Sequence, residues 1–376
     1  MCELAKKCFT FVSKEAVLCI SILLALLSCF FVPPSAAYLS YIDWDTLTLL
    51  FSLMAVMGGL QKSGFFVFTA NLLLKRISTT RTMIFLLVFL PFVFSMVITN
   101  DVALITFVPF GLTVLQLSGH EQLAVPQVIL QTVAANLGSM LTPMGNPQNL
   151  YLYNKSAMEF GQFCMLMLPY VLFSGICLAL IIVFIKPVNH ISAISLSNEL
   201  GNTSSLMFCA AGMALCLLGI FKVISPVIIA IAVIIFLLFA DRKLLVSIDY
   251  SLLGTFFAFF IFVGNIANIG RFQEFLSSVL AGNTELTAVI ASQIISNVPA
   301  ALLLSGFTAQ WQGLIVGCNL GGLGTLIASM ASLISYKMVV KAYPKQRKRY
   351  LGWFTLLNFC LLAVLILLHL LIKSLR

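Results

Sequence analysis

The chain has 376 residues, of which 61% are hydrophobic and only 9% charged, with a formal net charge of +9. Soluble proteins carry about 25% charged residues, so this chain has too little charge to cover a water-facing surface of its size. The composition excludes an ordinary soluble enzyme and a secreted disulfide-rich domain. The basic residues occupy short segments between apolar runs, which argues against a nucleic-acid partner. We therefore predict an all-α polytopic membrane protein whose partners include the lipid bilayer.

Nine apolar runs approach or exceed the length needed to cross a bilayer, which is about 20 residues. They cover residues 16–35, 45–62, 122–153, 162–186, 206–221, 226–241, 249–268, 312–340 and 351–373. Two further runs, 82–117 and 284–307, are interrupted by Thr99-Asn100-Asp101 and by Ser296-Asn297-Val298-Pro299. Unsatisfied polar groups are costly in hydrocarbon, so a continuous helix is disfavoured at both points. We expect each run to be a re-entrant hairpin that enters and leaves the membrane on one side.

The distribution of basic residues predicts the orientation of these segments. With the N-terminus in the cytoplasm, nine crossings and two hairpins place 16 of the 21 Lys and Arg residues on the cytoplasmic side. If either hairpin crossed the membrane, this asymmetry would be lost. We expect an external C-terminus and a location in the cytoplasmic (plasma) membrane of a bacterium.

Three sequence blocks recur in the same order in the two halves of the chain. Ile42-Asp43-Trp44 matches Ile248-Asp249-Tyr250, Asn136-Leu137-Gly138 matches Asn319-Leu320-Gly321, and the two hairpin tips match each other. The spans 45–62 and 249–268 would enter the membrane from opposite sides. The pattern therefore predicts two inverted-topology repeats, an arrangement by which many transporters place a site near the middle of the membrane.

This interpretation divides the chain into four parts. Residues 1–13 form a cytoplasmic segment, and residues 14–186 form the first repeat, with hairpin 82–117 and a broken helix at 122–153. Residues 187–223 form a linker and an extra helix, 206–221. Residues 224–376 form the second repeat, with hairpin 284–307 and a broken helix at 312–340.

Polar residues and helix breakers mark the first broken helix. Residues 138–149 read GSMLTPMGNPQN, and two prolines in this stretch remove backbone donors and clash with the preceding turn. Unwinding would leave carbonyl groups that suit Na⁺ and N–H groups that suit an anion. The alternative is a proline kink with packing glycines. The residues expected to bind are Thr142, Gly145, Asn146, Gln148 and Asn149.

The second broken helix has no proline, but four glycines lie between residues 317 and 324. Glycines in a membrane helix can also form a face for close helix packing. This packing role remains an alternative to a role in ligand binding. Because the stretch matches the first break, we expect Asn319, Gly324, Thr325 and Ser329 to contribute to the same site.

Asp101 is the acid at the centre of the first hairpin tip. A carboxylate in the membrane has to be solvated, paired or protonated. We interpret Asp101 as part of a Na⁺ site or as a proton carrier, and the alternative is a cap on the returning helix. The second hairpin has Val298 at this position, so hairpin geometry does not require an acid.

Three stretches, ITNDVALITFVPF, LTPMGNPQN and SQIISNVPAALLL, resemble the ion transporter superfamily. That group includes arsenite permeases, NhaD-type Na⁺/H⁺ antiporters, citrate transporters and divalent anion:Na⁺ symporters. The resemblance implies separate scaffold and transport domains, an elevator-like motion and a homodimer. In the dicarboxylate branch each tip reads Ser-Asn-Thr. Here Asn100 and Asn297 keep the amide, Thr99 and Ser296 keep a hydroxyl, and both third positions differ.

The function expected from these observations is secondary transport of a small anion or oxyanion, driven by Na⁺ or H⁺. Na⁺/H⁺ antiport and arsenite efflux are alternatives within the same class, and an ion channel and an intramembrane enzyme are more distant ones. The chain has no P-loop, HExxH or GxSxG motif, so we expect no catalytic residues and no cofactor beyond the coupling ion. The predicted Na⁺ site lies near Asn100, Asp101, Asn146 and Asn297.

Overall fold

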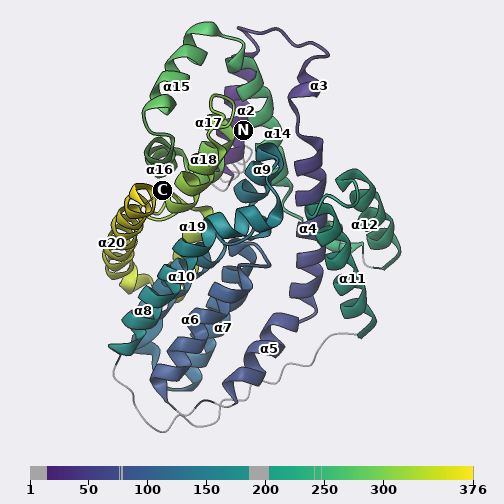
Figure 1. Cartoon of the computed structure of the whole chain (residues 1–376). Coiled ribbons are helices and arrows are strands. Elements are labelled where there is room, and N and C mark those ends of the chain that lie inside the picture. Colours follow the sequence, from purple (N-terminus) through teal and green to yellow (C-terminus); the bar gives the residue numbers. More distant parts are fainter. Residues whose placement is uncertain are drawn as a thin grey trace, which may run out of the picture.

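The computed structural model describes residues 15–375, except for residues 76, 78, 186–202, 241 and 247. The predicted cytoplasmic segment 1–13 and most of the predicted linker lie outside the described residues. Within them the chain is built almost entirely from helices (Figure 1).

The first half of the chain supplies nine of the described α-helices. They are α2 (Ala16–Ser28), α3 (Tyr38–Tyr41), α4 (Trp44–Lys62), α5 (Phe65–Leu74), α6 (Thr80–Phe94), α7 (Asn100–Leu117), α8 (Ala124–Gly138), α9 (Pro147–Ser156) and α10 (Phe160–Val183). A 3₁₀ turn, Glu121–Leu123, precedes α8, and a second one, Pro143–Gly145, lies between α8 and α9.

The second half supplies ten more. They are α11 (Thr203–Ile220), α12 (Pro226–Ala240), α13 (Lys243–Val246), α14 (Tyr250–Ala267), α15 (Gly270–Gly282), α16 (Thr284–Ile295), α17 (Asn297–Leu304), α18 (Trp311–Leu320), α19 (Met330–Ala342) and α20 (Arg347–Ser374). A 3₁₀ turn, Pro344–Gln346, leads into α20.

Four of the described helical segments are long and apolar enough to cross a membrane on their own. They are α7, α10, α14 and the continuous segment Pro344–Ser374, while α4 and α5 together form a fifth segment bent by 50°. Helices α2, α6, α11, α12 and α16 are also apolar but have shorter apolar stretches of 10–17 residues. The predicted count of nine crossings includes several of these shorter helices.

Three local features differ from the sequence-based expectation. The first span was expected at 16–35, but α2 ends at Ser28, ahead of the Pro33-Pro34 pair, which cannot continue a regular helix. Helices α5 and α15 were not predicted. Helix α5 begins after Gly64, whose φ of +72° permits the sharp turn from α4. Helix α15 is too polar to stand out as an apolar run.

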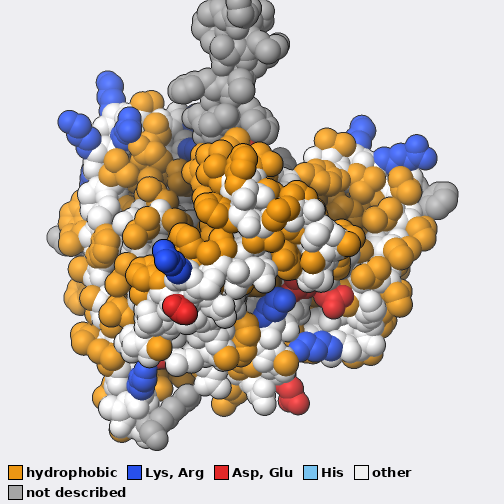
Figure 2. All heavy atoms as spheres, turned by 90° about the horizontal axis from the view of Figure 1, so that it is seen from above, with side chains coloured by type: hydrophobic (Ala, Val, Ile, Leu, Met, Phe, Trp, Pro, Cys, Tyr) orange, Lys and Arg blue, Asp and Glu red, His pale blue; other side chains and the backbone are white. Residues whose placement is uncertain are grey.

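Helix α8 lies at the centre of one group of helices and packs against α6, α7, α10 and α20. Helix α18 packs against α16, as α8 packs against α6. Helix α4 packs against α11 and α12 at the opposite edge of the molecule from α20 (Figure 1). Figure 2 shows hydrophobic side chains gathered over the upper part and the sides of the visible face, with charged side chains scattered among polar and backbone surface elsewhere. Large hydrophobic side chains are exposed on α2, α10, α12 and α20, and such a surface is suited to contact with lipid.

Candidate functional site

Asn100 begins α7, directly after the interruption between the two arms of the first predicted hairpin. Its Nδ2 donates to Oδ1 of Asn136 on α8 at 2.9 Å, and its Oδ1 accepts from the backbone N–H of Asp101 at 3.0 Å. Asn100 is 4% exposed. Thr99 is half-buried and makes no side-chain cap bond. The tip amide is therefore held from two sides.

Asp101 lies in the first turn of α7 and is half-buried. The partial positive charge at a helix N-terminus favours a carboxylate there. Its Oδ1 is buried and accepts no hydrogen bond from the residues that the structure describes. An oxygen in this state is suited to take up a proton or a cation.

Asn136 connects the two halves of the molecule. Its Oδ1 accepts from Asn100 and also from Oγ of Ser329 at 3.1 Å, and its Nδ2 donates to Oγ of Ser332 at 3.1 Å. Asn136 was not among the predicted site residues. The signal that could have identified it is its match to Asn319, which was predicted.

Asn319 makes the equivalent contact from the second half of the chain to the first. Its Nδ2 donates to Oδ1 of Asn149 on α9 at 2.7 Å. Asn136 and Asn319 lie 183 positions apart in the chain, and so do their partners Asn149 and Ser332. The first half of each broken helix thus contacts the second half of the other.

Contacts between the hairpins and the broken helices also recur at fixed offsets between the two halves of the chain. Thr142 Oγ1 donates to the backbone oxygen of Met96, and Thr325 Oγ1 donates to that of Gln293 at 3.2 Å. The two threonines lie 183 positions apart, and the two acceptors lie 197 apart, as do the two tip asparagines.

Two glycines allow the close packing of these elements. An ideal Cβ on Gly138 would lie 1.9 Å from the backbone oxygen of Phe92 and 2.7 Å from Oγ of Ser95. A Cβ on Gly321 would lie 2.6 Å from Oγ of Ser292. The glycines share the offset of 183, and the serines share the offset of 197. Both broken helices therefore meet their hairpins at equivalent positions.

The first break is held together by its own amides. Asn146 Nδ2 donates to Oγ of Ser139 at 2.6 Å, and Asn149 Nδ2 lies 3.2 Å from the carbonyl oxygen of Ser139 and 3.4 Å from that of Thr142. Asn149 thereby contacts the carbonyl groups of Ser139, the C-cap of α8, and of Thr142 in the unwound stretch. A Cβ on Gly145 would lie 2.1 Å from the Ser139 carbonyl oxygen, so only glycine fits there.

Some buried polar atoms near the breaks have no hydrogen-bond partner among the described residues. Gln148, in the first turn of α9, is 1% exposed, and neither its oxygen nor its nitrogen is hydrogen-bonded there. Oδ1 of Asn319 is in the same state. Unsatisfied groups of this kind are rare in folded proteins and are suited to bind a ligand.

The second break is held by Gln293 on α16, which the sequence analysis did not single out. Its Nε2 donates to the carbonyl oxygens of Gly321 and Leu323, both at 2.9 Å, and its Oε1 accepts from the backbone N–H of Thr325 at 2.8 Å. Gly324 has φ of +104°, and a Cβ there would lie 2.3 Å from Oε1 of Gln293. Glycine is therefore required at this position for two reasons.

The second hairpin tip rests on the second break. The backbone N–H of Asn297 donates to the carbonyl oxygen of Ala328 at 3.0 Å, and Oγ of Ser296 lies 3.4 Å from the same oxygen. Ser296 has φ of +74° and ψ of 154°, a backbone conformation almost confined to glycine. Strain of this kind is commonly found at ligand-binding sites.

These contacts bring most of the predicted site residues into one buried polar cluster. Ser139 Oγ also donates to the backbone oxygen of Asn136 at 2.9 Å, so Asn100 and Asn146 are linked through Asn136 and Ser139. Asn297 contacts Ala328, the neighbour of Ser329 in the chain. Gln148 is not tied to the others by a hydrogen bond among the described residues.

The sequence model of citrate transporters matches residues 8–311, which is most of the chain. The chain belongs to this family. An uncharacterised transporter of Methanocaldococcus jannaschii, MJ0456, is 31% identical over 305 residues, covering 79% of this chain and 81% of that protein. The inner membrane protein YbiR of Escherichia coli is 29% identical over 347 residues, covering 82% and 84%.

The crystal structure of the Alcanivorax borkumensis YdaH transporter has a similar fold. The TM-score is 0.57 at 14% sequence identity, and the match covers 90% of this chain and 88% of that one. The protein is therefore a membrane transporter of the citrate transporter family, and the resemblance to the wider ion transporter superfamily is confirmed.

Proposed function

We propose that the protein is a secondary active transporter that moves a small anion or oxyanion with Na⁺ or H⁺ as the coupling ion. The observation that carries this proposal is the buried amide and hydroxyl cluster around Asn136, which joins both hairpin tips and both helix breaks.

The helix ends around this cluster support an anionic substrate. Helices α7 and α17 begin at the hairpin tips, and α9 and α19 begin at the helix breaks. The N-terminus of each helix carries about half a unit of positive charge. Unpaired backbone N–H groups at such ends bind phosphate, sulfate and carboxylate groups. No Lys or Arg takes part in the hydrogen bonds given above, so amides, hydroxyls and helix N-termini would hold the anion.

The opposite helix ends support a coupling cation. Helices α6 and α16 end at the hairpin tips, α8 and α18 end at the helix breaks, and all four present carbonyl groups there. Among the described residues, no cluster of three or more His, Cys, Asp and Glu side chains could hold a metal ion. A Na⁺ ion would instead use carbonyl and amide oxygens near Asn100, Asn146 and Asn297, together with Asp101. Alternatively, Asp101 carries a proton.

The recurring contacts at offsets of 183 and 197 support two inverted repeats, with boundaries near residues 14–186 and 224–376. In this arrangement α4, α11 and α12 belong to a scaffold, and the hairpins with the broken helices form a transport domain that moves as an elevator. We further propose a homodimer, a cytoplasmic N-terminus, an external C-terminus and a bacterial cytoplasmic membrane. A cation gradient would then drive the substrate across by alternating access.

A proteoliposome assay tests this function. Purified protein is reconstituted, and uptake of citrate, smaller carboxylates, inorganic oxyanions and arsenite is measured under imposed Na⁺ and pH gradients. The proposal expects gradient-driven accumulation of one anion class. Na⁺/H⁺ exchange without any added anion would favour the alternative that the protein is an antiporter. Transport of arsenite alone would favour the alternative that it is an arsenite efflux permease. Flux that only dissipates gradients, without accumulation, would indicate a channel and overturn the proposal.

A further inference from the structure

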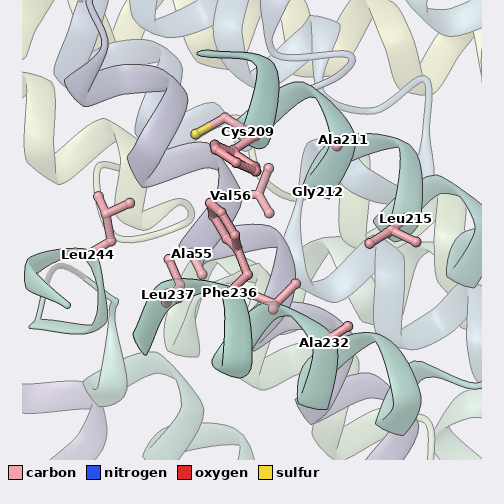
Figure 3. Close-up of a pocket in the computed structure, with 12 residues that line it drawn as sticks. Ala55, Val56, Cys209, Ala211, Gly212, Leu215, Ala232, Phe236, Leu237 and Leu244 are labelled. Atoms are coloured by element: carbon pink, nitrogen blue, oxygen red, sulfur yellow. The ribbon is translucent and has the colours of Figure 1, made fainter. Parts of the chain in front are cut away.

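An apolar cavity of about 140 Å³ lies between α4, α11, α12 and α13, on the far side of α4 from the polar cluster (Figures 1 and 3). All of its lining residues are apolar or glycine, and Val56, Cys209, Phe236 and Leu244 represent the four helices. Apolar cavities of roughly this size stay dry and accept hydrophobic ligands. The cavity therefore suits a hydrocarbon group rather than a polar substrate.

The wall of the cavity is partly open toward the surroundings. Phe208 is 50% exposed, and Ala211 and Ala232 are exposed although both line the cavity. Elsewhere the same helices touch closely, because a Cβ on Gly212 would lie 2.8 Å from Val56. The space thus reaches the lipid-facing surface while the helices around it remain in contact.

Three cations border one end of this cavity. Lys62 ends α4, six residues beyond Val56, which corresponds to about 9 Å along a helix. Arg242 and Lys243 directly precede Leu244 in the chain, and Leu244 lines the cavity. A Cβ on Gly59 would lie 3.3 Å from Leu244, which places the last turn of α4 beside α13. All three basic residues are exposed.

We infer that this cavity is a binding site for a diacyl phospholipid with an anionic headgroup. A segment of one acyl chain would occupy the cavity, and the phosphate would lie among Lys62, Arg242 and Lys243. An amphiphile with hydrocarbon at one end and negative charge at the other matches both features. The surrounding bilayer supplies such molecules, and basic residues at a membrane surface attract anionic lipids.

Native mass spectrometry of the purified, delipidated full-length protein tests this site. The probes are phosphatidylglycerol and phosphatidylcholine with identical acyl chains, titrated separately. Wild-type protein should retain one phosphatidylglycerol molecule with higher affinity than phosphatidylcholine. The variant Ala211→Leu/Ala232→Leu fills the cavity from its exposed wall and should weaken this binding on the order of tenfold. Ala210→Leu/Ala214→Leu is the matched control, because both alanines are exposed on α11 outside the lining.

Charge variants test the headgroup contact separately. Lys62→Gln/Arg242→Gln/Lys243→Gln should remove the preference for phosphatidylglycerol while phosphatidylcholine still binds. Lys341→Gln/Lys345→Gln/Lys348→Gln removes the same number of exposed charges elsewhere and should keep the preference. Unchanged phosphatidylglycerol binding in the filled or the uncharged variant overturns the proposal. A dimer that dissociates in the filled variant, with lipid binding unaltered, would assign the cavity to a second copy of the chain instead.

Discussion

Asn319 on α18 donates a 2.7 Å hydrogen bond to Asn149 on α9, across 170 residues of sequence, and both side chains are buried. The bond ties the first half of one broken helix to the second half of the other. Its counterpart is the bond from Asn136 to Ser332. The two bonds hold the breaks against each other in a way that neither half of the chain could achieve alone.

A double-mutant cycle tests the coupling across this bond. Asn319→Ala leaves Asn149 Oδ1 without its donor, and each single variant should therefore lower the melting temperature in detergent. A direct bond predicts that Asn319→Ala/Asn149→Ala is less destabilised than the sum of the singles, with a coupling of about 0.5–3 kcal/mol. Strictly additive melting shifts would show that the two side chains do not interact.

Asp101→Asn tests the role of the tip acid. The substitution keeps the shape of the side chain but removes its charge and its ability to bind and release a proton. Ion-driven uptake should fall at least tenfold, on the order of the effect of losing one essential charged contact, while the protein stays inserted and monodisperse. Asp45→Asn is the control, because Asp45 is also in the first turn of a helix but is exposed. Normal ion-dependent uptake in Asp101→Asn would remove Asp101 from the mechanism.

Much of the helix pattern could be predicted from apolar runs and helix breakers. Pro143 and Pro147 mark the first break, and the polar tips mark the two hairpin interruptions, because these residues are incompatible with a continuous helix in lipid. Helices α5 and α15 escaped prediction. Helix α15 is too polar to stand out as an apolar run, whereas α5 is apolar but only ten residues long. The turn at Gly64 before α5 depends on a backbone angle that glycine permits but does not require.

Recurrence between the two halves predicts that the tip asparagines lie beside the helix breaks, but it gives no signal for Gln293. Asn100 and Asn297 share a motif and both contact the breaks. Gln293 has no polar counterpart, since Met96 lies at the matching position, and a glutamine inside an apolar helix gives no signal of the carbonyl groups it faces. Only three-dimensional packing shows that role.

Cysteines at the two tip asparagines test whether substrate reaches them. In a background without native cysteines, Asn100→Cys and Asn297→Cys should react slowly with a membrane-impermeant thiol reagent, and transported substrate should slow each reaction further. Ser278→Cys, exposed on α15, should react quickly whether or not substrate is present. Equal labelling rates with and without substrate at both tips would place the binding site elsewhere.

Gly138→Ala tests the contact between α8 and the first hairpin. The new Cβ would lie 1.9 Å from a backbone oxygen, which cannot move aside as a side chain can. We expect destabilisation of about 1–3 kcal/mol or more and loss of monodisperse protein. In Gly321→Ala the new Cβ would lie 2.6 Å from Oγ of Ser292 and 2.9 Å from the Gly317 carbonyl oxygen, so the overlap is smaller and the loss of stability should be smaller too.

Gly352→Ala is the matched control for these two variants. Gly352 is exposed within α20, and a Cβ there meets no atom within 4 Å. Replacing a helical glycine by alanine at such a position should raise stability by about 0.5–1 kcal/mol. Thermal melting followed by fluorescence ranks all three variants. A Gly138→Ala protein as stable as wild type would contradict the close packing at this point.

Gln293→Met removes the side chain amide that holds the second break and introduces the residue found at the equivalent position of the first hairpin, Met96. The carbonyl oxygens of Gly321 and Leu323 and the N–H of Thr325 would then lose their partner. Each buried unsatisfied group costs about 1–3 kcal/mol, so the unwound stretch should lose its fixed shape. Substrate affinity should fall more than maximal uptake rate. Gln293→Glu keeps the acceptor for Thr325 but turns a carboxylate oxygen toward the carbonyl oxygens of Gly321 and Leu323, so it should lower substrate affinity at least as much as Gln293→Met.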